Sequence, residues 1–202
     1  MGVAVGTGQN SVAQRDSLQS VSLPTRSASQ QPGAVHQDVE ERLKPWCAPV
    51  PAIREAITQP DRHRALALID REKLQASQSS VITAGARERF WQQIERSSPE
   101  MIKAALVASM LCFEGMNSST RMRESNLYNL PPTPTLLRLL QREDLSPEAK
   151  ALAVLIMGPK RCGHTEVQAL RPLAAEQNIS PLLAEALAWL NKELHNALKA
   201  LP

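Results

Sequence analysis

The segment from Ser98 to Met116, SPEMIKAALVASMLCFEGM, constrains the fold of this chain more than any other. Between Ala104 and Phe113 every residue except Ser109 is apolar. A helix at the surface of a globular protein has one apolar stripe, whereas a helix that is apolar on most sides is enclosed by other helices. We therefore expect this segment to form the central, buried helix.

Composition indicates that the surrounding elements are also helices. Apolar residues make up 43% of the chain but aromatic residues only 3%, so the core must consist mainly of Leu, Ala, Ile, Val and Met. That mixture suits contacts between helices, because strands favour aromatic and β-branched residues. We find no convincing strand pattern and predict an all-α fold, a bundle of about seven to nine helices.

Three of the predicted helices begin with a serine followed by a proline. The serine hydroxyl can accept a hydrogen bond from an orphan backbone N–H, and proline has no N–H to leave unpaired in the first turn. These starts are Ser98-Pro99, Ser146-Pro147 and Ser180-Pro181. Gly115 and Gly158 lie where C-terminal caps are expected.

The other helices are predicted from apolar spacing and from the prolines that bound them. They are Asp38–Lys44, ended by Pro45, then Ala52–Thr58, Pro60–Ala76, Val81–Ser97, Thr135–Glu143 and Thr165–Gln177, the last kinked or split at Pro172. The core faces expected on three helices are Leu66, Ile69 and Leu74; Ile82, Ala86, Phe90 and Ile94; and Leu183, Leu187, Leu190, Leu194, Ala197 and Leu201.

Residues 1–37 differ in composition from the rest of the chain. They contain six Ser, six Gln, no aromatic residue and only three charged residues. Such a segment cannot bury enough apolar surface to offset its conformational entropy, so we expect a disordered leader. The helical domain is then residues 38–202, and the prolines between 131 and 134 suggest a subdomain elbow near 117–134.

The charge pattern does not favour nucleic acid as a partner. The formal net charge is only +3, and charges of both signs are interspersed, whereas nucleic-acid-binding domains are usually far more basic. Four arginines near the predicted elbow, which we expect to be solvated, are Arg121, Arg123, Arg138 and Arg142.

The cysteines and histidines do not form a recognisable site. Cys47, Cys112 and Cys162 are odd in number and widely spaced, so they predict no disulfide framework. Cys162-x-His164 offers two ligands where a structural zinc site needs four, so we predict no metal and no cofactor. A Cys–His nucleophile pair stays open, because its members need only meet in space. No signature names a reaction, so an enzyme is not favoured.

The string Trp91-Gln92-Gln93-Ile94-Glu95 places a Trp and a Glu on one helix face. It resembles the W-x-x-x-E motif of a family of bacterial type III secretion effectors, all-helical proteins that activate Rho-family GTPases as guanine-nucleotide exchange factors. The resemblance implies that Trp91 and Glu95 are scaffold residues that hold helical subdomains in place.

In that family a loop with an Ala-Gln dipeptide enters the GTPase switch region. The segment Ala76-Ser77-Gln78-Ser79-Ser80 is similar to this loop, which implies a catalytic role for Gln78. The order differs, because the family's motif precedes the loop whereas Trp91 follows Gln78 here.

Polar, Ser/Gln-rich leaders that are poor in acidic residues resemble those of type III secretion substrates. We therefore hypothesise a bacterial type III secreted effector or secretion-associated protein, a virulence factor that binds a host protein or a secretion chaperone. It would reside in the bacterial cytoplasm before export and enter a host cell afterwards. The alternatives are an exchange factor for small GTPases and a cytosolic adaptor or regulator that is never exported. Membrane contact is expected only if Gly2 is lipidated.

Overall fold

The structure, a computed structural model, describes residues 32–76, 84–114 and 131–199. Over these ranges the chain forms nine α-helices and one 3-10 helix, and no strand, so the predicted all-α class is confirmed for the described part. The elements are α1 (Pro32–Cys47), α2 (Pro51–Ala56), α3 (Gln59–Ala76), α4 (Ala84–Glu95), α5 (Pro99–Glu114), α6 (Thr133–Gln141), α7 (Pro147–Met157), η1 (Pro159–Arg161), α8 (His164–Ala174) and α9 (Pro181–Lys199).

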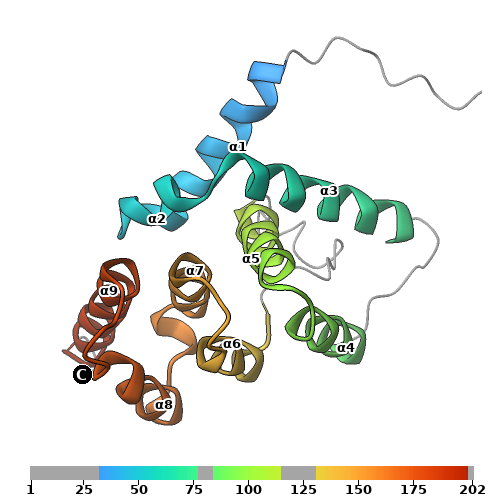
Figure 1. Ribbon diagram of the computed structural model, residues 1–202. Coiled ribbons are helices and arrows are strands. Elements are labelled where there is room, and N and C mark those ends of the chain that lie inside the picture. The colour runs from blue at the N-terminus through green and yellow to red at the C-terminus, as the bar shows by residue number, and fades with distance from the viewer. Residues whose placement is uncertain (1–31, 77–83, 115–130, 200–202) are drawn as a thin grey trace, which may run out of the picture.

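The predicted central helix is α5. It lies in the middle of the molecule and packs against α1, α3, α4 and α7 (Figure 1). Ile102 and every residue from Ala104 to Leu111 are buried, including the hydroxyl-bearing Ser109. Each fully buried Leu, Ile, Val or Met side chain contributes about 1.5–3 kcal/mol relative to exposure. The centre of the bundle is therefore held by contacts on all sides of α5.

A second helix, α7, is also largely buried. Ala149 and every residue from Ala151 to Met157 are buried, and α7 packs against α2, α5, α6 and α9. Its 11 residues are too few to span a bilayer, and no described helix has the length and apolar character to do so. The core therefore extends from α5 through α7 to α9, and Figure 1 shows these three helices next to one another.

The three Ser-Pro helix starts behave as the sequence predicts. The Oγ atoms of Ser98, Ser146 and Ser180 each accept a hydrogen bond, at 3.3 Å, from the backbone N–H three residues later. Gly158 ends α7 with φ 56°, a conformation that favours glycine. The other expected cap, Gly115, lies outside the described residues.

Two prolines that were expected to interrupt helices do not. α1 begins at Pro32, before the expected Asp38, and continues through Pro45 to Cys47; α8 continues through Pro172 to Ala174. Each proline lies in the last turn, where it removes only one backbone hydrogen bond. In α1 this loss is offset by an apolar face of Val39, Leu43 and Cys47, all at most 1% exposed. The rest of the expected leader, residues 1–31, lies outside the described residues.

The proline-rich segment after residue 130 begins a helix. Pro132 is the N-cap residue, with φ −56° and ψ 139°, and α6 starts at Thr133 rather than at Thr135. Pro134 suits this position because the first helical turn needs no intrahelical N–H donor. Residues 117–130 of the expected elbow lie outside the described residues.

The expected core faces are only partly correct. On α3 the buried apolar residues among the described side chains are Ala65, Leu68 and Ile69, while Leu66 is half-buried, so the face is rotated from the prediction. On α4 they are Trp91 and Ile94. On α9 the predicted Leu183, Leu187 and Leu190 are buried together with Ala186, and this face packs against α7. The side chains of Leu74, Ile82, Ala197 and Leu201 lie outside the described residues.

Candidate functional site

The candidate scaffold residue Trp91 lies on the inner face of α4. Its side chain is 0% exposed, and the Phe90 ring meets it edge-on, with centroids 5.8 Å apart and planes at 86°. Such aromatic pairs contribute about 0.5–1.5 kcal/mol beyond the area that they bury. Phe90 lies on the same helix, so it is the burial of Trp91 in the core that anchors α4 to the body of the protein.

Glu95 joins α4 to α6 through a bidentate ion pair. The Arg138 guanidinium donates from Nε to Glu95 Oε1 at 2.6 Å and from Nη2 to Oε2 at 2.9 Å. This bond raises the pKa of Arg138 above its ordinary value, more than burial lowers it. The side chains are 20% exposed for Glu95 and 48% for Arg138, so water and salt reach the pair. A pair of this kind contributes about 0.2–1 kcal/mol.

A second arginine of the α6 region binds the end of α4. Arg142 Nη1 donates to the backbone carbonyls of Glu95 and Ser97, while Nε donates to Asp144 Oδ1 at 2.8 Å. The last carbonyls of a helix have no intrahelical partner and carry partial negative charge, so a cation placed there is favourable. We call the residues Glu95, Arg138 and Arg142 the α4–α6 clamp.

The clamp changes the interpretation of the arginines near the elbow. Arg138 and Arg142 are not simply solvated, because both are bound to α4 from 43 to 47 residues away in sequence. Arg138 lies on α6, and Arg142 is the residue that ends this helix, so both reach α4 from the C-terminal half of α6. The spacing of four between the two arginines was the available sequence signal. Arg121 and Arg123 lie outside the described residues.

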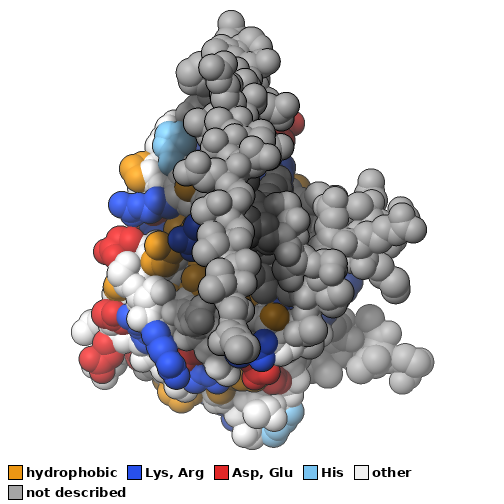
Figure 2. All heavy atoms as spheres, turned by 90° about the vertical axis from the view of Figure 1, so that its right-hand side faces the viewer, with side chains coloured by type: hydrophobic (Ala, Val, Ile, Leu, Met, Phe, Trp, Pro, Cys, Tyr) orange, Lys and Arg blue, Asp and Glu red, His pale blue; other side chains and the backbone are white. Residues whose placement is uncertain are grey.

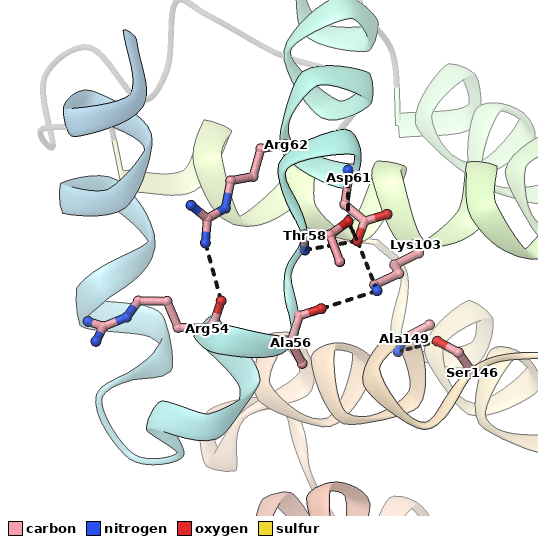
Figure 3. A network of polar contacts seen from close by, with 8 residues as sticks. All are labelled: Arg54, Ala56, Thr58, Asp61, Arg62, Lys103, Ser146 and Ala149. Atoms are coloured by element: carbon pink, nitrogen blue, oxygen red, sulfur yellow. Dashed lines mark hydrogen bonds and ion pairs between the residues drawn. The ribbon is translucent and has the colours of Figure 1, made fainter. Parts of the chain in front are cut away.

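A buried polar junction between α2, α3 and α5 was not predicted. Thr58 and Asp61 cap α3: Thr58 N–H and Oγ1–H donate to Asp61 Oδ2 at 3.1 and 2.7 Å. Lys103 of α5 reaches this cap, with its Nζ 2.9 Å from Asp61 Oδ2 and 3.3 Å from the carbonyl oxygen of Ala56 (Figure 3). Two sequence signals were present: the capping pattern Thr58-x-x-Asp61, and one charged residue, Lys103, in an otherwise apolar run.

Asp61 stays ionised in this junction. Burial raises the pKa of its carboxyl group, but hydrogen bonds from Lys103 and Thr58 and the charge of Lys103 outweigh burial, so the pKa lies below its ordinary value. The side chains are 8% exposed for Asp61 and 14% for Lys103. The junction therefore links the end of α2 and the start of α3 to the central helix by a nearly buried ion pair.

Cys162, a member of the Cys162-x-His164 pair, is not an activated nucleophile. None of the three cysteines forms a disulfide; Cys47 is buried, and Cys112 and Cys162 are half-buried. Burial, followed by the charge of Glu166, raises the pKa of Cys162 to about 11, so its thiol is protonated at neutral pH. His164 approaches Gln168, at 3.4 Å. Among the described residues no three His, Cys, Asp or Glu side chains gather to hold a metal ion.

The remaining candidate, Gln78, lies outside the described residues. Of the predicted site residues, the structure thus places Trp91 and Glu95 one turn apart on α4; Trp91 is buried, and Glu95 belongs to the clamp.

Comparisons with protein-family models, with curated proteins and with solved structures give no match to this chain. Its function must be argued from its own residues.

Proposed function

We propose that this chain is a bacterial type III secreted effector or secretion-associated protein that acts by binding a protein partner. The observation that carries the proposal is the α4–α6 clamp beside the buried Trp91. This is an arrangement in which a Trp and a Glu one turn apart hold two helices together, the role that the W-x-x-x-E motif implies. Neither residue acts on a substrate; both keep a binding surface in shape.

The character of the surface supports a protein partner. On the face shown in Figure 2, basic and acidic side chains of the described residues lie close to one another with apolar side chains between them. Mixed surfaces of this kind suit a protein partner, whereas nucleic acid is bound mainly by cations that neutralise phosphates.

The leader supports export, and a reporter fusion tests it. Residues 1–37 fused to a reporter enzyme should be exported by bacteria with an active type III apparatus and retained by an isogenic strain that lacks its ATPase. A fusion of residues 38–74 is the matched control of equal length. Retention of the leader fusion in both strains would refute export and favour the alternative, a cytosolic adaptor or regulator that is never exported.

Partner binding is tested with the full chain and clamp variants. Wild type, Glu95→Gln and Glu185→Gln would be immobilised and exposed to host-cell lysate and to candidate secretion chaperones. Glu185 is exposed on α9, outside the clamp, and so is the matched control. A specific partner should be captured by wild type and the control and weakly by Glu95→Gln. Equal capture by all three would contradict a scaffold role for Glu95.

A second candidate is exchange activity on small GTPases, which the buried Trp91 and the clamped Glu95 favour. Residues 77–83 connect α3 to α4, so Gln78 belongs to the segment that enters the helix fixed by the clamp. Purified chain should accelerate release of a fluorescent nucleotide from a Rho-family GTPase, and Gln78→Ala should abolish that acceleration. Identical rates with and without the chain across a panel of Rho-family GTPases would exclude this activity. The effector proposal would then depend on the other two experiments.

A further inference from the structure

The helix α4 is attached to the rest of the described protein differently from the central helices. It lies at one edge of the molecule and packs against α5 and α6 (Figure 1). Of its side chains that the structure describes, residues 85–95, only Trp91 and Ile94 are buried, whereas α5 buries nine. Segments with few buried apolar side chains open at lower free energy than the core.

Among the described residues, two arginines of the α6 region bind the C-terminal end of α4. Arg138 binds the Glu95 carboxylate, and Arg142 binds the Glu95 and Ser97 carbonyls. Arg138 is 48% exposed, and Arg142 is itself held by Asp144, which is 53% exposed. Ion pairs with this exposure are weakened by dissolved salt, because the Debye length falls to roughly 3 Å at 1 M. Apolar contacts such as those of α5 and α7 are not weakened in this way.

We propose that α4 is a latch that opens as a unit while the rest of the bundle stays folded, and that the α4–α6 clamp sets how often it opens. Opening exposes the Trp91 side chain together with the surfaces of α5 and α6 that α4 covers. The protein thus has a second state that presents an apolar surface, and its population rises when salt or a competing carboxylate displaces Glu95 from Arg138. This inference does not depend on the proposed function, because it concerns the isolated chain.

Hydrogen exchange of the full chain, resolved by residue, tests the latch. In wild type the backbone amides of residues 88–95 should exchange at least about tenfold faster than those of residues 103–110 and 151–157. Glu95→Gln should increase exchange in residues 88–95 a further 2- to 5-fold or so, and leave α5 and α7 unchanged. Glu185→Gln on α9 should change none of the three helices.

Salt dependence separates the latch from a general loss of stability. Raising NaCl from about 0.05 M to about 0.5 M should increase the ratio of α4 to α5 exchange in wild type and have little effect on that ratio in Glu95→Gln. Arg138→Gln should give the same result as Glu95→Gln. Equal protection of α4 and α5 in wild type would overturn the proposal. So would a Glu95→Gln effect that spreads to α5 and α7, unfolding of both variants, or a salt response that survives in both.

Discussion

Replacing Lys103 by Met should destabilise the whole bundle, because the Lys103 ammonium group links the central helix to the α2–α3 connection. Met has a similar length and apolar stem, so the packing of the chain around it is retained. What is lost is the charge and both donated hydrogen bonds, to Asp61 Oδ2 at 2.9 Å and to the Ala56 carbonyl at 3.3 Å. Asp61, 8% exposed, is left without its counter-ion.

The magnitude follows from how deeply the pair is buried. Removing one partner of a fully buried pair costs about 3–5 kcal/mol, since the other charge stays buried. Here Lys103 is 14% exposed and Asp61 keeps two hydrogen bonds from Thr58, so the cost should be lower. We expect a loss of about 2–3 kcal/mol in the free energy of unfolding. For a chain of this size that corresponds to a decrease in Tm of about 4–12 °C.

Urea unfolding at pH 7, followed by circular dichroism at 222 nm, measures the change. Lys192→Met is the matched control, because Lys192 is exposed on α9 and its loss should change stability by less than about 0.5 kcal/mol. The double variant Asp61→Asn, Lys103→Met should lose less stability than the sum of the two single variants, because either single change already removes the ion pair. A Lys103→Met protein as stable as Lys192→Met would refute the structural role assigned to the junction.

Asp61→Asn should make the free energy of unfolding less dependent on pH in acid. The folded state lowers the pKa of Asp61 below its unfolded value of 3.8, so the ionised carboxylate stabilises the fold at pH values above 3.8. This stabilisation is lost as the pH falls through the pKa of the folded state. The stability difference between wild type and Asp61→Asn should therefore shrink below about pH 4 in urea titrations, and a constant difference would contradict it. Gly158→Ala should lower the free energy of unfolding by about 1–3 kcal/mol, because φ at this residue is 56°, although an added Cβ would have room. Gly85→Ala in α4 should be neutral or stabilising. Equal effects of the two changes would be inconsistent with backbone strain at Gly158. Alkylation of Cys162 at pH 8, followed by mass spectrometry of its peptide, should be about two orders of magnitude slower than that of a small thiol, and a rate like that of a small thiol would disprove the raised pKa of about 11.

Sequence patterns predicted the parts of this fold that depend on neighbours in the chain. The serine hydroxyl and the N–H that it caps are three residues apart, so Ser98, Ser146 and Ser180 could be assigned from the sequence. The burial of α5 could be predicted for the same reason, because its apolar residues are contiguous. The predicted end of α1 was wrong: proline usually ends a helix, but here the helix continues past Pro45 and buries Cys47.

The candidate site depended on pairs that local patterns cannot identify. The W-x-x-x-E string indicated that Glu95 would bind something, but its partner Arg138 is 43 residues away. Lys103 and Asp61 are separated by 42 residues, and the apolar periodicity of their helices says nothing about which charged side chains meet. Which cation meets which carboxylate is decided by how the helices pack, and that requires the fold.

Several basic residues share a second role, which is to bind the carbonyl end of a helix. Four of them donate to a carbonyl in the last turn of a helix other than their own: Arg42 to Leu111, Arg62 to Arg54, Lys103 to Ala56 and Arg142 to Glu95. Carbonyls there have no intrahelical N–H partner and lie at the negative end of the helix dipole, so a cationic donor satisfies both needs at once. In a bundle of short helices the number of such ends is large relative to the core. The basic residues at these positions therefore belong to the architecture, and a surface for partners is to be sought among the charges that do not bind a helix end.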